Sequence, residues 1–178
     1  MNIDPHTALR SLAEHSQAAA ELMRAAVCDG CRSCVGEISD INRQTLSELS
    51  DLERELFLSS NKDEKALLSA AHALAFCVNR AFSAAMLLPD GLPTLPPLAE
   101  IVCANAALAA YPLRILSHDR ELSFYSLHLT ANKGRGAHAL LITNYCRTGA
   151  GQRLFPSVLA LERHRDALEQ ASATLTAL

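Results

Sequence analysis

Apolar side chains recur every three or four positions in VGEISDINRQTLSELSDLEREL, residues 35–56. The stripe consists of Ile38, Ile41, Thr45, Leu49, Leu52 and Leu56. Steps of three and four place these side chains on one face of an α-helix, which packs against a core. An adjacent face is acidic, with Glu37, Asp40, Glu48, Asp51 and Glu55. The stretch therefore predicts a long amphipathic helix whose acidic face is either solvated or holds hard cations.

The composition extends this prediction to the whole chain. Of 178 residues, 49% are apolar, 20% are charged and only 4% are aromatic, with no tryptophan. Abundant Ala and Leu favour helices over strands, so we expect an all-α fold. The length suits one domain, or two halves that share a core. A net charge of −3 and the lack of a basic stripe argue against a nucleic-acid partner.

The same periodicity predicts six helices in a single domain, 1–178. Three lie in a first half, 1–88, at about 5–27, 35–56 and 62–88. Prolines crowd 89–97, which predicts a linker, because proline removes a backbone donor. A second half, 98–178, follows with helices at 98–117, at 120–146 and at 158–175. Two glycines at 134 and 136 should interrupt or bend the middle one.

The chain is expected to be cytoplasmic and without a membrane span. Asp4 and His6 precede any apolar run, and there is no basic leader of the kind that signal peptides carry. The most apolar stretch, 66–88, contains His72, Asn79 and Arg80, which a bilayer centre would penalise, so it predicts a core helix. A peripheral membrane association stays open.

The last predicted helix carries a compact acidic group. Glu162, Asp166 and Glu169 are four and three residues apart, so their carboxylates share one helix face. Such a face can supply oxygen ligands to a metal in a helical bundle. The neighbouring Arg163, His164 and Arg165 favour an alternative, a surface of salt bridges.

A second candidate site is the run Cys28, Cys31 and Cys34, at the turn between the first two predicted helices. Thiolates at two-residue separation can converge on zinc or on an iron–sulfur cluster. The run lacks a fourth ligand nearby. The remaining cysteines, Cys77, Cys103 and Cys146, fall in apolar helices and are expected to be buried thiols. Free thiols or a redox-active pair are the alternatives.

An enzyme is not expected. The histidines are scattered, with no nucleophile–base pairing or metalloprotease motif around them. His72, in an apolar stretch, is expected to be a core side chain. The segment 122–161 has no acid but carries Lys133, Arg135, Arg147 and Arg153, so a basic loop there could receive an anion.

Three stretches carry a family resemblance: VGEISDINRQ (35–44), NKDEKALLSAAHALAFCVN (61–79) and LERHRDALE (161–169). Together they resemble the PhoU-like phosphate transport regulators. The resemblance implies two tandem three-helix bundles and a non-enzymatic protein that regulates phosphate uptake. The implied partner is a phosphate transporter or its regulatory system.

The family binds metals through Glu-x-x-x-Asp and Asp-Asp-x-x-Asp motifs, which this chain keeps only in part. Asp40 stands where the first motif has Glu, but Gln44 replaces its Asp. The resemblance thus implies a divalent metal or iron at Asp40, Glu162, Asp166 and Glu169. His128, Asn132 and His138 are the candidates to replace missing acids on the facing helix.

Two further possibilities stay open. A homo-oligomer could complete the metal site across subunits. The alternative function is a metal or redox sensor that uses Cys28, Cys31 and Cys34 on the same helical fold.

Overall fold

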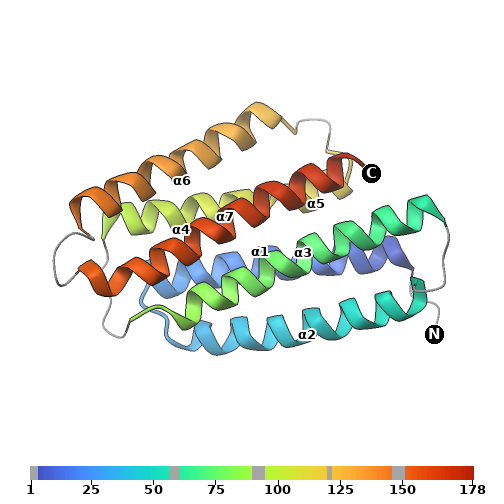
Figure 1. Ribbon diagram of the computed structural model, residues 1–178, viewed down its shortest axis with the longest axis horizontal. Helices are drawn as coiled ribbons and strands as arrows, with labels where there is room; N and C mark the ends of the chain where they lie inside the picture. Colours follow the sequence, from blue (N-terminus) through green and yellow to red (C-terminus); the bar gives the residue numbers. More distant parts are fainter. Residues whose placement is uncertain (1–3, 57–60, 90–94, 120–121, 146–150) are drawn as a thin grey trace.

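The computed structural model describes residues 4–56, 61–89, 95–119, 122–145 and 151–178 (Figure 1). The α-helices are α1 (Pro5–Cys28), α2 (Ser33–Leu56), α3 (Lys62–Met86), α4 (Pro96–Ala109), α5 (Tyr111–Leu116), α6 (Phe124–Asn144) and α7 (Phe155–Thr176). A 3₁₀ turn, η1 (Gly151–Leu154), leads into α7. These residues contain no strand, and the all-α prediction is confirmed.

The helices form two groups that lie side by side. Helices α1, α2 and α3 pack on one another, and α4 packs on α6 and α7. Figure 1 shows the second group above the first, with the long helices nearly aligned. The most extensive contact between helices joins the two groups, and it is formed by α3 and α7. Helix α1 also contacts α4.

Two clusters of buried apolar side chains form the core. One contains Leu12, Leu52, Leu74, Leu108 and Leu168. The other contains Met23, Ile38, Val78, Ile101 and Leu161. Each cluster therefore takes side chains from α1, α2, α3, α4 and α7. The two groups of helices therefore share both clusters.

Local chemistry explains where the helices begin. The Asp4 carboxylate accepts hydrogen bonds from the backbone N–H groups of His6 and Thr7, which caps α1. Asn61 caps α3 by accepting from the Asp63 N–H at 3.0 Å. Helix α4 begins with the prolines at 96 and 97, two residues earlier than predicted. Residues 90–94 of the predicted linker 89–97 lie outside the described residues, so the division into halves stays a prediction.

Two helix predictions for the second half are wrong. The expected helix 98–117 divides into α4 and α5, because Pro112 has no N–H to continue the hydrogen-bond ladder of α4. Helix α6, by contrast, continues through both glycines without a break. Gly134 lies where α6 meets α4 and α7. A Cβ there would lie 3.3 Å from the Ala104 Cβ and 3.5 Å from the Arg165 Cδ, so glycine allows the close approach.

Helix α3 and the run Pro96–Leu116 are long and apolar enough to span a membrane, judged by length and composition. Core helices pass the same test, and α3 lies among α1, α2 and α7. Of the most apolar window of α3, 39% is buried inside the protein.

Candidate functional site

The predicted acidic group on α7 surrounds a buried arginine. Arg165 is only 3% exposed. Its guanidinium lies 3.3 Å from the Glu162 carboxylate, 2.9 Å from Asp166 and 3.6 Å from Glu169. Side chains three or four positions apart on a helix are neighbours, so Glu162 and Glu169 both reach the Arg165 guanidinium. The three acids are thus together, as predicted, but around an internal positive charge.

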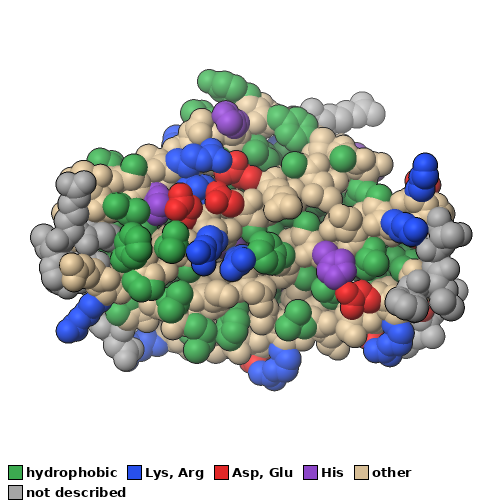
Figure 2. Space-filling view, in the orientation of Figure 1, with side chains coloured by type: hydrophobic (Ala, Val, Ile, Leu, Met, Phe, Trp, Pro, Cys, Tyr) green, Lys and Arg blue, Asp and Glu red, His purple; other side chains and the backbone are tan. Residues whose placement is uncertain are grey.

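Helix α6 covers this group and adds two side chains to it. Arg135 donates from one nitrogen to both Glu169 oxygens at 2.7 Å. The His138 Nδ1 lies 3.3 Å from a Glu162 oxygen. Burial is the main cause that lowers the pKa of His138, and Arg165 adds to this while Glu162 opposes it. We call these six residues, Arg135, His138, Glu162, Arg165, Asp166 and Glu169, the α6–α7 cluster. Figure 2 shows acidic, basic and histidine side chains gathered over these helices.

A second buried polar group lies behind the cluster. His164 is fully buried, and its Nδ1 lies 3.5 Å from the Asn105 side-chain nitrogen on α4. That nitrogen also donates to the Leu161 carbonyl at 3.0 Å. Burial lowers the pKa of His164 to about 4.

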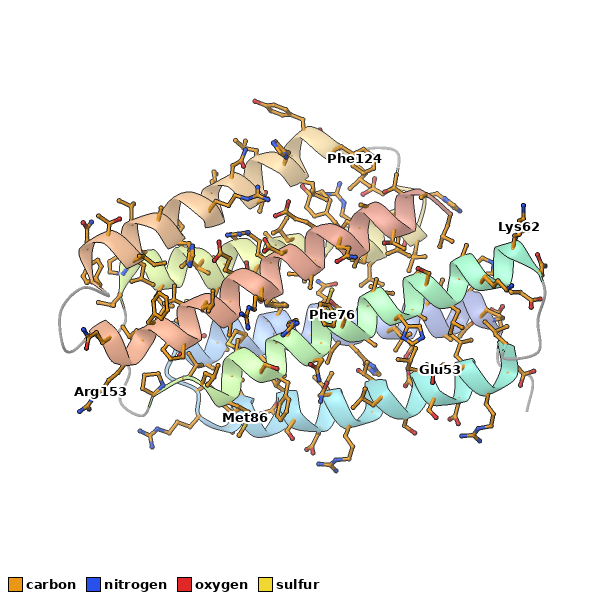
Figure 3. All side chains as sticks on the ribbon, in the orientation of Figure 1. Glu53, Lys62, Phe76, Met86, Phe124 and Arg153 are labelled. Carbon is orange, nitrogen blue, oxygen red and sulfur yellow. The ribbon has the colours of Figure 1, made fainter. Side chains whose placement is uncertain are left out.

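The sequence contained a signal for this histidine. His164 is three residues after Leu161 and four before Leu168, which places it on the apolar stripe of α7. The prediction of a core position for His72 is wrong. That side chain is exposed, and its Nε2 lies 3.1 Å from Glu53 of α2. Figure 3 labels Glu53 between α2 and α3.

The cysteines form pairs rather than one group of three. Cys31 and Cys34 are near enough to shift each other's pKa, and Cys103 of α4 is near enough to raise the pKa of Cys28. Cys103 is exposed, so the prediction of a buried thiol there is wrong, whereas Cys77 is fully buried as expected. Burial raises the pKa of Cys77 to about 12. Cys146 lies outside the described residues.

The arrangement as a whole is similar to a solved structure. It is the crystal structure of the phosphate transport system regulatory protein PhoU from Streptococcus pneumoniae. The TM-score is 0.73, and the similarity covers 96% of this chain and 91% of that chain. The chain has the PhoU fold. The identity is 13%, so the likeness is one of fold, and no family model and no curated protein sequence matches the chain.

The metal that the PhoU resemblance implies can be tested against these contacts. Each acid of the α6–α7 cluster is already paired with a guanidinium. The residues that the structure describes include no group of three or more His, Cys, Asp or Glu side chains placed to hold a metal. Asp40 lies on α2, which packs on α1 and α3, and it pairs with Arg43 at 2.8 Å. The metal site stays a prediction, and the geometry favours an ion-pair cluster instead.

The three predicted substitute ligands on α6 differ in whether they reach the acids of α7. His138 faces the acids, but the Asn132 side-chain oxygen accepts a hydrogen bond from Arg135 at 3.0 Å, and His128 is exposed. Only one of the three candidates therefore reaches the acids of α7 in this PhoU-like chain.

The acidic face of α2 is held mainly by neighbours on its own helix and on α1. Glu48 accepts hydrogen bonds from Ser11 at 2.8 Å and from Gln44 at 3.1 Å. Asp51 pairs with Arg54 at 3.2 Å. These contacts are those of a solvated face beside an apolar one.

Proposed function

We propose that the chain is a non-enzymatic, cytoplasmic regulator of phosphate transport that acts through protein contacts. One observation supports this above all: the PhoU fold extends over nearly the whole length of both chains. The proposed partner is a phosphate transporter or its regulatory system, reached from solution or by peripheral association. Because fold alone does not fix function, a partner surface and a cellular test are needed.

The outer face of α6 is the best candidate for that surface. Tyr125, Leu129 and Leu140 are all exposed, and Tyr125 is 76% exposed. Steps of four and eleven residues place them on one side of the helix. Phe124, labelled in Figure 3, starts the same helix at the edge of the molecule. Tyr125 and Leu129, one helical turn apart, form an exposed apolar pair that a protein partner could cover, and Leu140 extends the same face.

The α6–α7 cluster supports this surface from behind. Arg135 and His138 tie α6 to Glu169 and Glu162 of α7, so the cluster fixes the position in which α6 presents its outer face. The positive charge of Arg165 would balance the acids of the cluster in place of a bound metal. Elemental analysis of untagged protein, with its mass in solution, tests the predicted metal and the predicted homo-oligomer directly.

The cellular test compares phosphate uptake in the native host with and without the chain, at high and low external phosphate. Loss of the chain should deregulate uptake, and the parent sequence should restore control. The triple variant Tyr125→Ser, Leu129→Ser and Leu140→Ser should fold but fail to restore it. Leu46→Ser, which removes an exposed leucine from α2, is the matched control and should restore it. Uptake that is identical with and without the chain would refute the proposal.

A further inference from the structure

Two cysteines flank the start of α2 in unlike surroundings. Gly30, with a φ of 66°, turns the chain after α1, and α2 begins at Ser33. Cys31 lies two residues before the helix and is half-buried. Cys34 lies in the first turn, points into the protein and is only 3% exposed. One sulfur is therefore accessible to a small reagent, and the other is shielded.

The two thiols are neighbours. Cys31 and Cys34 each shift the pKa of the other, and the Cys31 Sγ lies 3.3 Å from the Ser33 hydroxyl. Only two residues separate the cysteines, so a disulfide between them closes a short loop at little cost in chain entropy. The spacing Cys-x-x-Cys at a helix N-terminus is an arrangement that supports thiol–disulfide exchange.

The electrostatics divide the roles of the two sulfurs. Hydrogen bonds to Cys34 and Ser33 lower the pKa of Cys31 below its ordinary value. Burial is the main cause that raises the pKa of Cys34 to about 11. At neutral pH the accessible sulfur thus has more thiolate character, and the thiolate is the nucleophile in exchange.

We propose that Cys31 and Cys34 are a redox-active dithiol that small-molecule disulfides oxidise to an intramolecular disulfide. The Cys31 thiolate attacks one sulfur of the small disulfide, so a mixed disulfide forms and one thiolate leaves. That thiolate takes the Cys34 proton. The Cys34 sulfur then attacks the Cys31 sulfur, and the second small thiolate leaves and is protonated by solvent. Two electrons pass from the protein to the small disulfide, which becomes two thiols.

The other thiol contact does not compete for Cys31. Burial and the neighbouring Cys103 together raise the pKa of Cys28. Because Cys28 is next to Cys103, the dithiol of Cys31 and Cys34 differs from the predicted metal site, which also needs Cys28. Among the residues with described positions, three such ligands do not come together. This proposal is independent of the proposed role in phosphate transport.

Trypsin provides a direct test, because Arg32 lies between the two cysteines. The reduced full chain is incubated with oxidised glutathione, its free thiols are blocked, and it is digested without reduction. Peptide 25–32 contains Cys28 and Cys31, peptide 33–43 contains Cys34, and peptide 81–114 contains Cys103. We expect 25–32 linked to 33–43, and the same linkage in Cys28→Ser.

Variants separate the two steps of the exchange. Cys34→Ser should stop at a mixed disulfide between glutathione and Cys31, and Cys31→Ser should lose both products. Circular dichroism checks that each variant keeps its helices. Linkage of 25–32 to 81–114 instead, or thiols that all stay free, would overturn the proposal. Stoichiometric zinc that is lost in Cys31→Ser would overturn it too, in favour of a metal site.

Discussion

Lowering the pH from 7 to 5 should destabilise the protein, and a large share of this effect should come from His164. The ring is fully buried on α7, and its polar neighbour is the neutral Asn105 side chain. In the unfolded chain the imidazole is solvated, with a pKa of about 6.5. In the folded protein burial lowers the pKa to about 4. Between these two values the unfolded chain binds one proton that the folded protein does not.

The sign and size of the effect follow from proton linkage. The stabilisation from neutral His164 is fully present above the pKa of the unfolded chain. It is lost as the pH falls toward the pKa in the folded protein, because protons favour the state that binds them. At pH 5 the free energy of unfolding should be about 2 kcal/mol lower than at pH 7 from this group alone. The limit below pH 4 is about 3 kcal/mol.

Urea unfolding at pH 7, 6 and 5 measures this contribution as a difference between variants. His164→Gln keeps a neutral polar side chain but cannot take up the proton. The gap in unfolding free energy between parent and variant should therefore narrow by about 2 kcal/mol from pH 7 to pH 5. His128→Gln, which removes an exposed histidine from α6, controls for the loss of a histidine as such. Parallel curves for parent and His164→Gln, or an NMR titration of the ring with a pKa above 6, would refute the reasoning.

Two further pairs of variants test the contact between α6 and α7. Arg165→Met removes the guanidinium that pairs with the partly buried Glu162 and with Asp166, so it should cost about 2–4 kcal/mol in urea unfolding. The exposed neighbour variant Arg163→Met should stay within about 0.5 kcal/mol, and equal losses would contradict a buried cluster. Gly136→Ala meets no atom within 4 Å and should gain about 0.5–1 kcal/mol. Gly134→Ala crowds Ala104 and should lose about 1 kcal/mol, so a gain would contradict tight packing of α6 on α4.

The spacing of residues in the sequence predicted the features that depend on a single helix. The stripe from Ile38 to Leu56 defined α2 to within two residues of its observed start, because helical periodicity is a property of neighbouring positions. The shared face of Glu162, Asp166 and Glu169 followed for the same reason.

Contacts between distant segments were beyond such reasoning. Arg165 was interpreted as a surface partner, since its burial depends on α6, which approaches closely at Gly134. The contact of Cys28 with Cys103 joins α1 to α4 and has no local pattern at all. The metal prediction rested on acid spacing alone, and spacing does not reveal which cation the acids already hold.

Both core clusters contain side chains from both groups of helices, and this sharing determines how the protein unfolds. Leu74 and Leu168 come from opposite groups of helices, yet they belong to one cluster. Separating the groups would open both clusters to water along their full length. Neither group can melt first while the other stays intact, so heat should unfold all the helices in one cooperative transition. A chain cut between α3 and α4 would leave two fragments that depend on each other for their shape.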